Sequence, residues 1–218
     1  MIVTIDAGLE GIVTLGVLRL AGVSVRAEDP RLAAEVEEAC ASFRARFAGR
    51  PSGDVPGAED ARGLYKAFGI DPTRTRPSNE SLLRRALKGE ALYRINTAVD
   101  AVNLCSLVQQ LPYGLYDAAQ IEPPVVLRRG AEGESYEGIR KGTISLGGRP
   151  VLADARGAFG NPTSDSARTS VGLETRDLLV TVYAPRAAGR ARLERVLDAT
   201  VDVMVQHCGG DCVDRDIL

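Results

Sequence analysis

Apolar and polar residues follow two different periods in the N-terminal part of the chain. In residues 12–20 and 23–27 apolar side chains alternate with other residues, which predicts two strands joined at Ala21-Gly22. From residue 30 to 48 the apolar residues recur at spacings of three and four, which predicts an amphipathic helix. Asp29-Pro30 is a suitable start for this helix, because Asp caps helix N-termini and Pro fits the first turn.

Helical spacing returns after a loop rich in Pro and Gly at residues 50–60. A short helix is predicted around residues 64–68. Another is predicted to begin at Ser78 or Asn79, where small polar residues precede a pair of leucines. The most apolar helix is predicted at residues 95–111, and its hydrophobic residues surround most of its circumference. Such a helix is expected to be buried on several sides.

Three polar residues, Asp100, Asn103 and Gln110, fall within one stripe of this apolar helix. Polar groups on a buried helix need hydrogen-bond partners, because removing them from water otherwise costs free energy. The partners of this stripe are expected to be either backbone groups or a bound ligand.

The second half of the chain is rich in predicted strands and in glycine-containing turns. Residues 124–129, 143–146, 150–155 and 177–185 have the apolar, β-branched character of strands, and a last helix is predicted at 191–207. Strands, then helices, then strands with a closing helix indicate the α+β class rather than alternating βαβ units.

Length and composition limit the classes of function. The chain has 218 residues, 44% of them hydrophobic, which is enough for one large core or at most two small domains. Its 27 basic and 29 acidic residues give a net charge of −2, so no overall field attracts nucleic acid. No apolar segment is long enough to span a membrane, and the N-terminus does not resemble a secretory signal. The expected location is the cytoplasm, where the four cysteines are thiols.

One segment departs from this charge balance. Between Lys66 and Arg94 the chain carries seven basic residues against three acidic ones. Two interpretations stay open, a solvated helix face and a patch that contacts phosphates. The residues of this segment that would contact phosphates are Arg74, Arg76, Arg84, Arg85 and Lys88.

The motifs of common catalytic and metal sites are missing from the sequence. HCGGDC at residues 207–212 is a single cluster without the second pair of ligands that a zinc site needs, and Gly209-Gly210 is an ordinary helix end. The chain contains neither a dinucleotide-binding or P-loop glycine motif nor a G-x-S-x-G elbow, and it has one histidine. We therefore expect no metal, no cofactor and no nucleophile activated by a histidine base.

Three blocks of sequence, taken in order, resemble a known family. They are INTAVDAVNLCSLVQQLPYGLYDAAQI, VVLRRGAEGESYEGI and PVLADARGAF, which lie between residues 95 and 159. Together they resemble the B3/B4 domain, the editing domain in the beta chain of bacterial phenylalanyl-tRNA synthetase. The segments YKAFGIDPTRTRPSNESLLRR and SARTSVGLET are similar to the freestanding, single-domain members of that family. The similarity covers about residues 60–185.

The resemblance implies an α+β fold, a layered sandwich of mostly antiparallel β-sheets with a helix layer. Residues 1–218 would form one B3/B4-like domain, with a core at about 60–185. Residues 1–59 would add N-terminal strands and a helix, and residues 186–218 would add a C-terminal helix and tail.

The resemblance also implies a function. In the synthetase the pocket of this domain hydrolyses the ester of a mischarged tRNA and rejects tyrosine attached to the phenylalanine tRNA. The reaction is largely substrate-assisted, because the domain positions a water molecule and the terminal ribose without a protein nucleophile. This fits the missing nucleophile motifs, since an activated ester can react when it is oriented by a few hydrogen bonds. The implied partner is the aminoacylated 3′ end of tRNA or another RNA.

The pocket residues of the family carry over in part. The family's Asn falls on Asn103, whereas its pocket His falls on Gly114. The A-F-D that follows this His becomes Leu115-Tyr116-Asp117. The family's G-G-E segment, whose Glu contacts the tyrosine hydroxyl, corresponds to residues 161–171, where Asp165 is the nearest acid. The resemblance thus implies the fold without implying specificity for tyrosine.

These correspondences predict that GNPTSDSART, residues 160–169, forms a wall of the pocket and continues into a strand-like stretch, SARTSV. The residues expected to act in catalysis are Asn103, Asp165 and Thr169. Those expected to bind the substrate are Gly114, Tyr116, Ser164 and Arg168. Three functions stay open: a deacylase that acts on mischarged aminoacyl-tRNA in trans, a non-catalytic module that binds tRNA, another RNA or an amino acid, and a different small-molecule enzyme.

Overall fold

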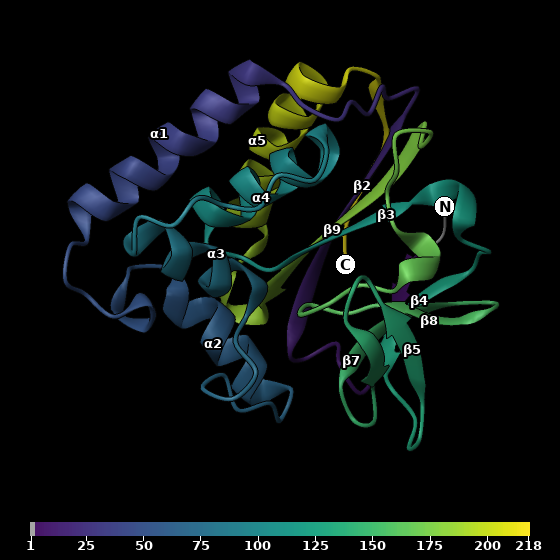
Figure 1. Ribbon diagram of the computed structural model, residues 1–218. Coiled ribbons are helices and arrows are strands. Elements are labelled where there is room, and N and C mark those ends of the chain that lie inside the picture. Colours follow the sequence, from purple (N-terminus) through teal and green to yellow (C-terminus); the bar gives the residue numbers. More distant parts are fainter. Residues whose placement is uncertain (1–2) are drawn as a thin grey trace.

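The computed structural model describes residues 3–218 and is built around a central antiparallel sheet (Figure 1). Its strands, in spatial order, are β10 (Asp211–Ile217), β2 (Val13–Ala21), β9 (Asp177–Pro185) and β3 (Tyr113–Asp117). Strand β9 is buried along all but its two end residues because both of its faces are covered. Val180 and Val182 face the helices, whereas Leu179 and Tyr183 face a second sheet.

The helices are α1 (Pro30–Arg46), α2 (Ala58–Ala67), α3 (Ser78–Leu87), α4 (Thr97–Gln109) and α5 (Arg190–Cys208). They cover one face of the central sheet, and α2 also packs Leu64 into the core between the two sheets. Helix α4 contacts α1, α3 and α5, and it is buried among them as its apolar circumference predicts. Figure 1 shows the helices on one side of the molecule and the second sheet on the other.

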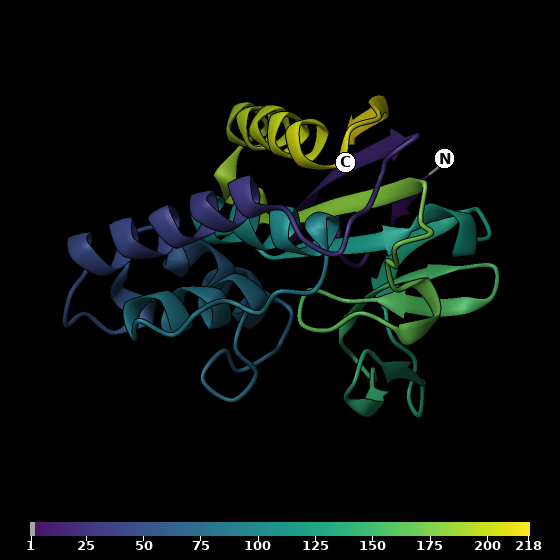
Figure 2. The same cartoon turned by 45° about the horizontal axis from the view of Figure 1, so that its top comes forward.

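The second sheet covers the opposite face of the central sheet. It contains β1 (Val3–Ile5), β4 (Val125–Arg129), β7 (Pro150–Asp154) and β8 (Gly157–Gly160), with one parallel pair, β1 and β4. Leu127, Leu152 and Phe159 of this sheet pack against Leu15 and Tyr183 of the central sheet. A separate hairpin, β5 (Ser135–Gly138) and β6 (Gly142–Ser145), lies at the end of the molecule away from α5 (Figure 2). The predicted α+β fold of layered sheets and helices is confirmed.

Two local predictions are wrong. Residues 23–27 form no strand: β2 ends at Ala21, and Gly22 turns the chain with a φ of 69°. Val23 and Val25 are still buried, against the helix layer, so their alternation reflects burial without strand pairing. The stretch SARTSV is not a strand either, because Ala167–Thr169 is a short 3₁₀ helix.

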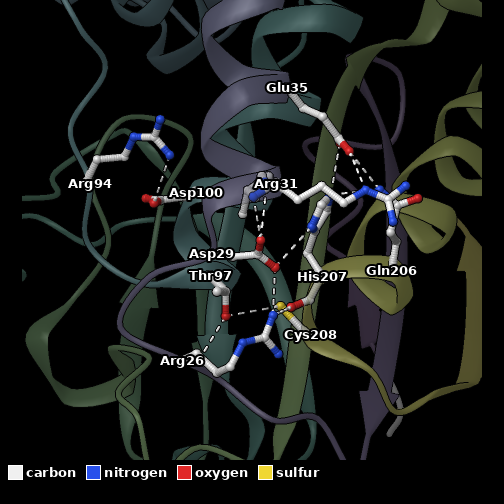
Figure 3. Close-up of polar contacts among 11 residues, drawn as sticks. Arg26, Asp29, Arg31, Glu35, Arg94, Thr97, Asp100, Gln206, His207 and Cys208 are labelled. Atoms are coloured by element: carbon white, nitrogen blue, oxygen red, sulfur yellow. Dashed lines mark hydrogen bonds and ion pairs between the residues drawn. The ribbon is translucent and has the colours of Figure 1, made fainter.

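The HCGGDC segment links α5 to β10 and does not form a site of its own. Gly209 and Gly210 have φ values of 65° and 76° and turn the chain between these two elements. The buried ring of His207 contacts two acidic residues of the α1 region, with Nε2 2.9 Å from Glu35 and Nδ1 3.5 Å from Asp29 (Figure 3). In the part of the chain that the structure describes, no group of three or more His, Cys, Asp and Glu side chains has a metal-binding arrangement.

Asp29 connects the start of α1 to the end of α5. Its Oδ1 accepts hydrogen bonds from the backbone N–H of Arg31 at 2.8 Å and of Leu32 at 3.2 Å, which confirms the predicted cap. Its Oδ2 accepts a hydrogen bond from Arg26 at 2.7 Å, and Arg26 also donates to the backbone carbonyl of His207 (Figure 3). None of the helices within residues 3–218 has both the length and the apolar character required to cross a bilayer.

Asp29→Ala is expected to lower the free energy of unfolding by about 0.5–2 kcal/mol, because α1 loses its N-terminal cap. Asp29→Asn is expected to cost less, since an amide oxygen can still accept the two backbone hydrogen bonds. Urea unfolding of both variants, with Glu28→Ala at the exposed neighbouring position as the control, measures the difference. Equal losses for Ala and Asn would show that the charge of Asp29, and not its cap, stabilises this end of α1.

Candidate functional site

A cavity of about 460 Å³ lies between the helix layer and the loop that follows β8. Helices α3 and α4, strand β3 and the turn of the β5–β6 hairpin contribute the remaining walls. One part of the wall is apolar and consists of Ile95, Val99, Val102, Tyr113, Leu115, Ile139 and Val171. The other part is polar and consists of Ser78, Asn103, Arg140, Asn161, Thr163, Ser164, Asp165 and Ser170.

The loop at residues 161–165 is held in place by its own hydrogen bonds. The buried side chain of Asn161 accepts hydrogen bonds from the backbone N–H of Thr163 at 2.8 Å and of Ser164 at 2.9 Å. Its amide nitrogen donates to the hydroxyl of Tyr136 at 2.7 Å. The hydroxyl of Tyr65 donates to the carbonyl of Pro162 at 2.8 Å. These contacts make the loop a fixed wall of the cavity.

Asp165 is the acidic residue of this wall. The hydroxyl of Tyr116, which extends from β3, donates a hydrogen bond of 2.8 Å to its Oδ1. Burial raises the pKa of Asp165 to about 7, although the hydrogen bonds from Tyr116 and from the backbone of Asn161 and Leu115 act in the opposite direction. The carboxyl group therefore changes its charge near neutral pH, which is the range in which a general base is most effective.

Four buried tyrosines, Tyr65, Tyr116, Tyr136 and Tyr183, lie around Asp165. Burial raises the pKa of all four hydroxyls, and the negative charge of Asp165 raises it further. The tyrosines therefore stay protonated at neutral pH, and Tyr65, Tyr116 and Tyr136 donate hydrogen bonds to the loop.

Of the three residues in the polar stripe of α4, two bind backbone groups and one lines the cavity. Asp100 accepts a hydrogen bond from the backbone N–H of Ile95 at 3.1 Å, and Gln110 donates to the carbonyl of Leu107 at 2.6 Å. Asn103 instead lines the cavity, and no hydrogen bond joins its side chain to another of residues 3–218. Its amide is therefore the member of the stripe that can bind a ligand.

A family model described as the B3/4 domain matches residues 60–209, about two thirds of the sequence. The chain belongs to the B3/4 domain family. The matched region extends beyond the predicted core at 60–185 and includes α5.

A solved structure with similarity to this B3/4 protein is an N-terminal fragment of the phenylalanyl-tRNA synthetase beta-subunit from Pyrococcus horikoshii. The two chains share 13% sequence identity, with a TM-score of 0.48. The match covers 94% of this chain and 48% of the fragment, so the B3/4 protein spans about half of the fragment's length. No curated protein gives a significant match.

Gly114 and Gly160 provide the space in which Tyr116 lies. A Cβ at either glycine would overlap the Tyr116 hydroxyl, and at Gly114 it would also lie 2.7 Å from Oγ1 of Thr181. The resemblance places His at position 114 and Phe at position 116. In this B3/4 protein the additional hydroxyl of Tyr116 uses the space that a side chain at position 114 would need. A side chain at position 114 and the hydroxyl of Tyr116 therefore compete for the same space.

The cavity brings together only part of the predicted site. Of the residues expected from the sequence, Asn103, Ser164 and Asp165 line it, and Tyr116 reaches it through Asp165. Gly114 lies behind Tyr116 and has no place in the cavity wall.

Arg168 and Thr169 lie elsewhere in the B3/4 protein. The guanidinium of Arg168 forms a two-pronged ion pair with Asp154 at 2.9 and 3.0 Å and also donates to the carbonyl of Gln120. Thr169 is buried, with its hydroxyl 3.4 Å from the carbonyl of Phe159. Both residues fix the loop to the second sheet and do not face the cavity.

Among the polar residues of the cavity, the sequence did not identify Arg140, Ser78 and Ser170. Arg140 lies at the turn of the β5–β6 hairpin with a φ of 55°, and the flanking Gly138 and Gly142 were the signal for this turn. Ser78 lies at the first turn of α3. Their positions depend on how the hairpin and α3 pack against the loop, and sequence spacing does not reveal this packing.

The basic segment divides into paired and exposed residues. Arg76 lies 3.5 Å from the buried Glu80, and Arg85 pairs with Glu90 at 3.2 Å and stacks on Tyr93. The exposed members are Arg74, Arg84 and Lys88.

Gly114→Ala is expected to destabilise the protein by about 1–3 kcal/mol, because the added methyl group overlaps Tyr116. In a Tyr116→Phe background the same change is expected to cost less, so the two effects are not additive. Gly172→Ala is the control, since a Cβ at Gly172 meets no atom within 4 Å. Urea unfolding of the four-member cycle tests this coupling. Additive costs would show that Tyr116 and Gly114 do not compete for space.

The raised pKa of Asp165 predicts how stability depends on pH. Between the ordinary carboxyl pKa and about 7, the folded protein keeps a proton on Asp165 that the unfolded chain has released. Stability contributed by this group therefore falls as pH rises through that window. Asp165→Asn removes this titration. The melting temperature of the variant minus that of the parent is therefore expected to increase between about pH 5 and about pH 8, because only the parent loses stability there.

Melting curves across this range test the prediction, with the exposed Asp211→Asn as the control. A difference between variant and parent that stays constant with pH would contradict the raised pKa.

Proposed function

We propose that this B3/4 protein is a deacylase that hydrolyses mischarged aminoacyl-tRNA in trans. The observation that carries the proposal is the pairing of two groups in one cavity, the Asn103 amide on α4 and the Asp165 carboxyl on the opposite loop. Asp165 titrates at about 7, and Asn103 has no internal partner within the described chain. The pair supplies a base and a hydrogen-bond donor on either side of a bound ester.

The cavity suits an aminoacyl group in size and lining. Its volume of about 460 Å³ lies within the range of pockets that bind small molecules. The side chain of the amino acid would pack against Val99, Val102 and Leu115, and its polar end would face the loop. Hydrophobic burial would stabilise this orientation and bring the ester toward Asp165.

Hydrolysis requires no protein nucleophile in this arrangement. Ionised Asp165 accepts a proton from water as the water oxygen attacks the ester carbonyl carbon. The Asn103 amide donates a hydrogen bond to the oxygen on which negative charge develops. The bond between the carbonyl carbon and the ribose oxygen then breaks, and the ribose oxygen takes up the proton. The products are a free amino acid and an uncharged tRNA.

A second function is supported by a separate observation. Arg140 is the one basic side chain among the described residues that line the cavity, and Asp165 is the one acidic side chain. A free amino acid carries an ammonium and a carboxylate group, which these two charges would complement. The missing family His at Gly114 agrees with this alternative, a module that binds an amino acid without hydrolysing an ester.

A panel of aminoacyl-tRNAs, each carrying a matched or mismatched amino acid, tests the proposal by release of the amino acid. For at least one pair, Asp165→Asn is expected to reduce kcat by about 10²–10⁴-fold and Asn103→Ala by about 10²–10³-fold. The rate is expected to rise with pH and level off above about 7, because Asp165 acts in its ionised form.

Asp211→Asn, which removes an exposed acid far from the loop in sequence, is the control and is expected to act like the parent protein. If no pair is hydrolysed above the background rate, the deacylase proposal is wrong. Thermal stabilisation by a free amino acid, abolished in Asp165→Asn and Arg140→Ala, would then support the binding module.

A further inference from the structure

Basic residues from two distant segments of the sequence meet at the C-terminal ends of α1 and α3. They line a hollow of about 500 Å³, formed by Gly49, Arg50, Pro51, Ser52, Arg84, Leu87 and Lys88. None of these described lining residues is acidic. Arg44 extends the same surface, since a Cβ at Gly89, next to Lys88, would lie 3.2 Å from its Nη1. We call this surface the basic hollow.

The cations of the basic hollow are largely without acidic partners. Within residues 3–218, no ion pair links Arg44, Arg50 or Arg84 to a carboxylate, and Lys88 lies 3.7 Å from Glu90. Their neighbours Arg76 and Arg85 are paired internally and contribute less free charge. The hollow therefore differs from the set of phosphate contacts predicted from the sequence. It keeps Arg84 and Lys88, excludes the other three residues and adds Arg44 and Arg50 from the α1 region.

Helix dipoles explain only part of this arrangement. A cation near a helix C-terminus is stabilised by the dipole, which applies to Arg44 in α1 and to Arg84 in α3. Arg50 lies in the loop after α1 and gains no such stabilisation. Like charges without counter-charges repel one another, and a bound anion would relieve that repulsion. The arrangement is unexpected in a chain with a net charge of −2.

We infer that the basic hollow binds the phosphate backbone of the RNA whose aminoacylated end enters the cavity, an inference that rests on the proposed function. Helix α3 connects the two places, because Ser78 at its start lines the cavity and Lys88 at its end lines the hollow. Ten residues at 1.5 Å per residue separate them by about 15 Å. A strand that rises about 3.4 Å per stacked nucleotide covers this distance in about four nucleotides.

The chemistry of the hollow fits phosphate groups in a row. Arg44, Arg50 and Arg84 present planar guanidinium groups, which match the oxygens of phosphate in a two-pronged geometry. Lys88 adds a point charge beside them. Such contacts position a nucleic acid and give salt-dependent affinity without reading its sequence.

The double variant Arg84→Ala/Lys88→Ala tests this inference. Its matched control is Arg186→Ala/Arg195→Ala, which removes two exposed cations without an ion pair in the described chain, one in η4 (Arg186–Ala188) and one in α5. Binding of bulk uncharged tRNA is measured over a range of salt concentrations. Log affinity falls with log salt, and the size of this negative slope is expected to decrease by about 1.4 in the hollow variant, about 0.7 for each lost contact with a single strand. In the control the slope is expected to stay unchanged.

A second measurement separates this inference from the deacylase proposal. An aminoacyl-adenosine ester fills the cavity alone, so its rate of hydrolysis is expected to be equal in the hollow variant and the parent protein. The KM for aminoacyl-tRNA is expected to rise in the hollow variant only. If the hollow variant loses tRNA affinity and the parent protein hydrolyses no aminoacyl-tRNA, RNA binding by the basic hollow is supported and the deacylase proposal is wrong.

Equal tRNA affinity and salt slope for the hollow variant and the control would overturn the inference. If the parent protein binds anionic phospholipid vesicles and the hollow variant does not, while tRNA binding is the same in both, the inference of RNA binding is wrong. The hollow would then bind a membrane surface. Circular dichroism and urea unfolding verify that both double variants are folded, which is expected because all four substituted side chains are exposed.

Discussion

The hydrogen bond between the Tyr116 hydroxyl and Asp165 is the contact on which the candidate site depends. It joins the edge strand of the central sheet to the loop after β8, and these two parts of the chain are separated by 49 residues. Without it, the half-buried carboxyl group of Asp165 and the buried hydroxyl of Tyr116 would both lose a partner, which costs free energy away from water. The bond also holds the carboxyl group of Asp165 in the wall of the cavity.

This hydrogen bond requires a particular set of neighbours. Gly114 and Gly160 leave the volume that the Tyr116 ring occupies, and Phe159 packs edge-on against the ring with 4.9 Å between centroids. The loop backbone is held by hydrogen bonds to the side chains of Tyr65 and Asn161. The resulting site is preorganised: its polar groups are oriented by packed side chains before any ligand binds. The glycine at position 114 is thus part of the packing around Tyr116.

Sequence periodicity predicted the elements that bury one or two continuous faces. Helix α4 and strand β9 were recognised because their apolar residues repeat over many positions. Strand β10 was not, because most of its residues are exposed and it pairs at the edge of the sheet. The alternation of Val23 and Val25 predicted a strand that does not exist, because these residues are buried against helices without pairing in a sheet. Burial leaves a pattern in the sequence, whereas pairing of backbone groups does not.

In the candidate site, too, the sequence predicted some positions correctly and missed what depends on three-dimensional packing. Composition identified residues 160–169 as polar, and the resemblance placed Asn103 and Asp165 together, as the cavity has them. Arg168 was expected to face the substrate, but its charge is neutralised by Asp154, whose side chain is 0% exposed. The same holds for Arg76 beside Glu80. Sequence reveals which residues carry charge, whereas the fold decides which charges are paired. Within residues 3–218, Arg50 and Arg84 of the basic hollow are among the cations without an acidic partner, and Arg84 lies on the helix whose first turn lines the cavity.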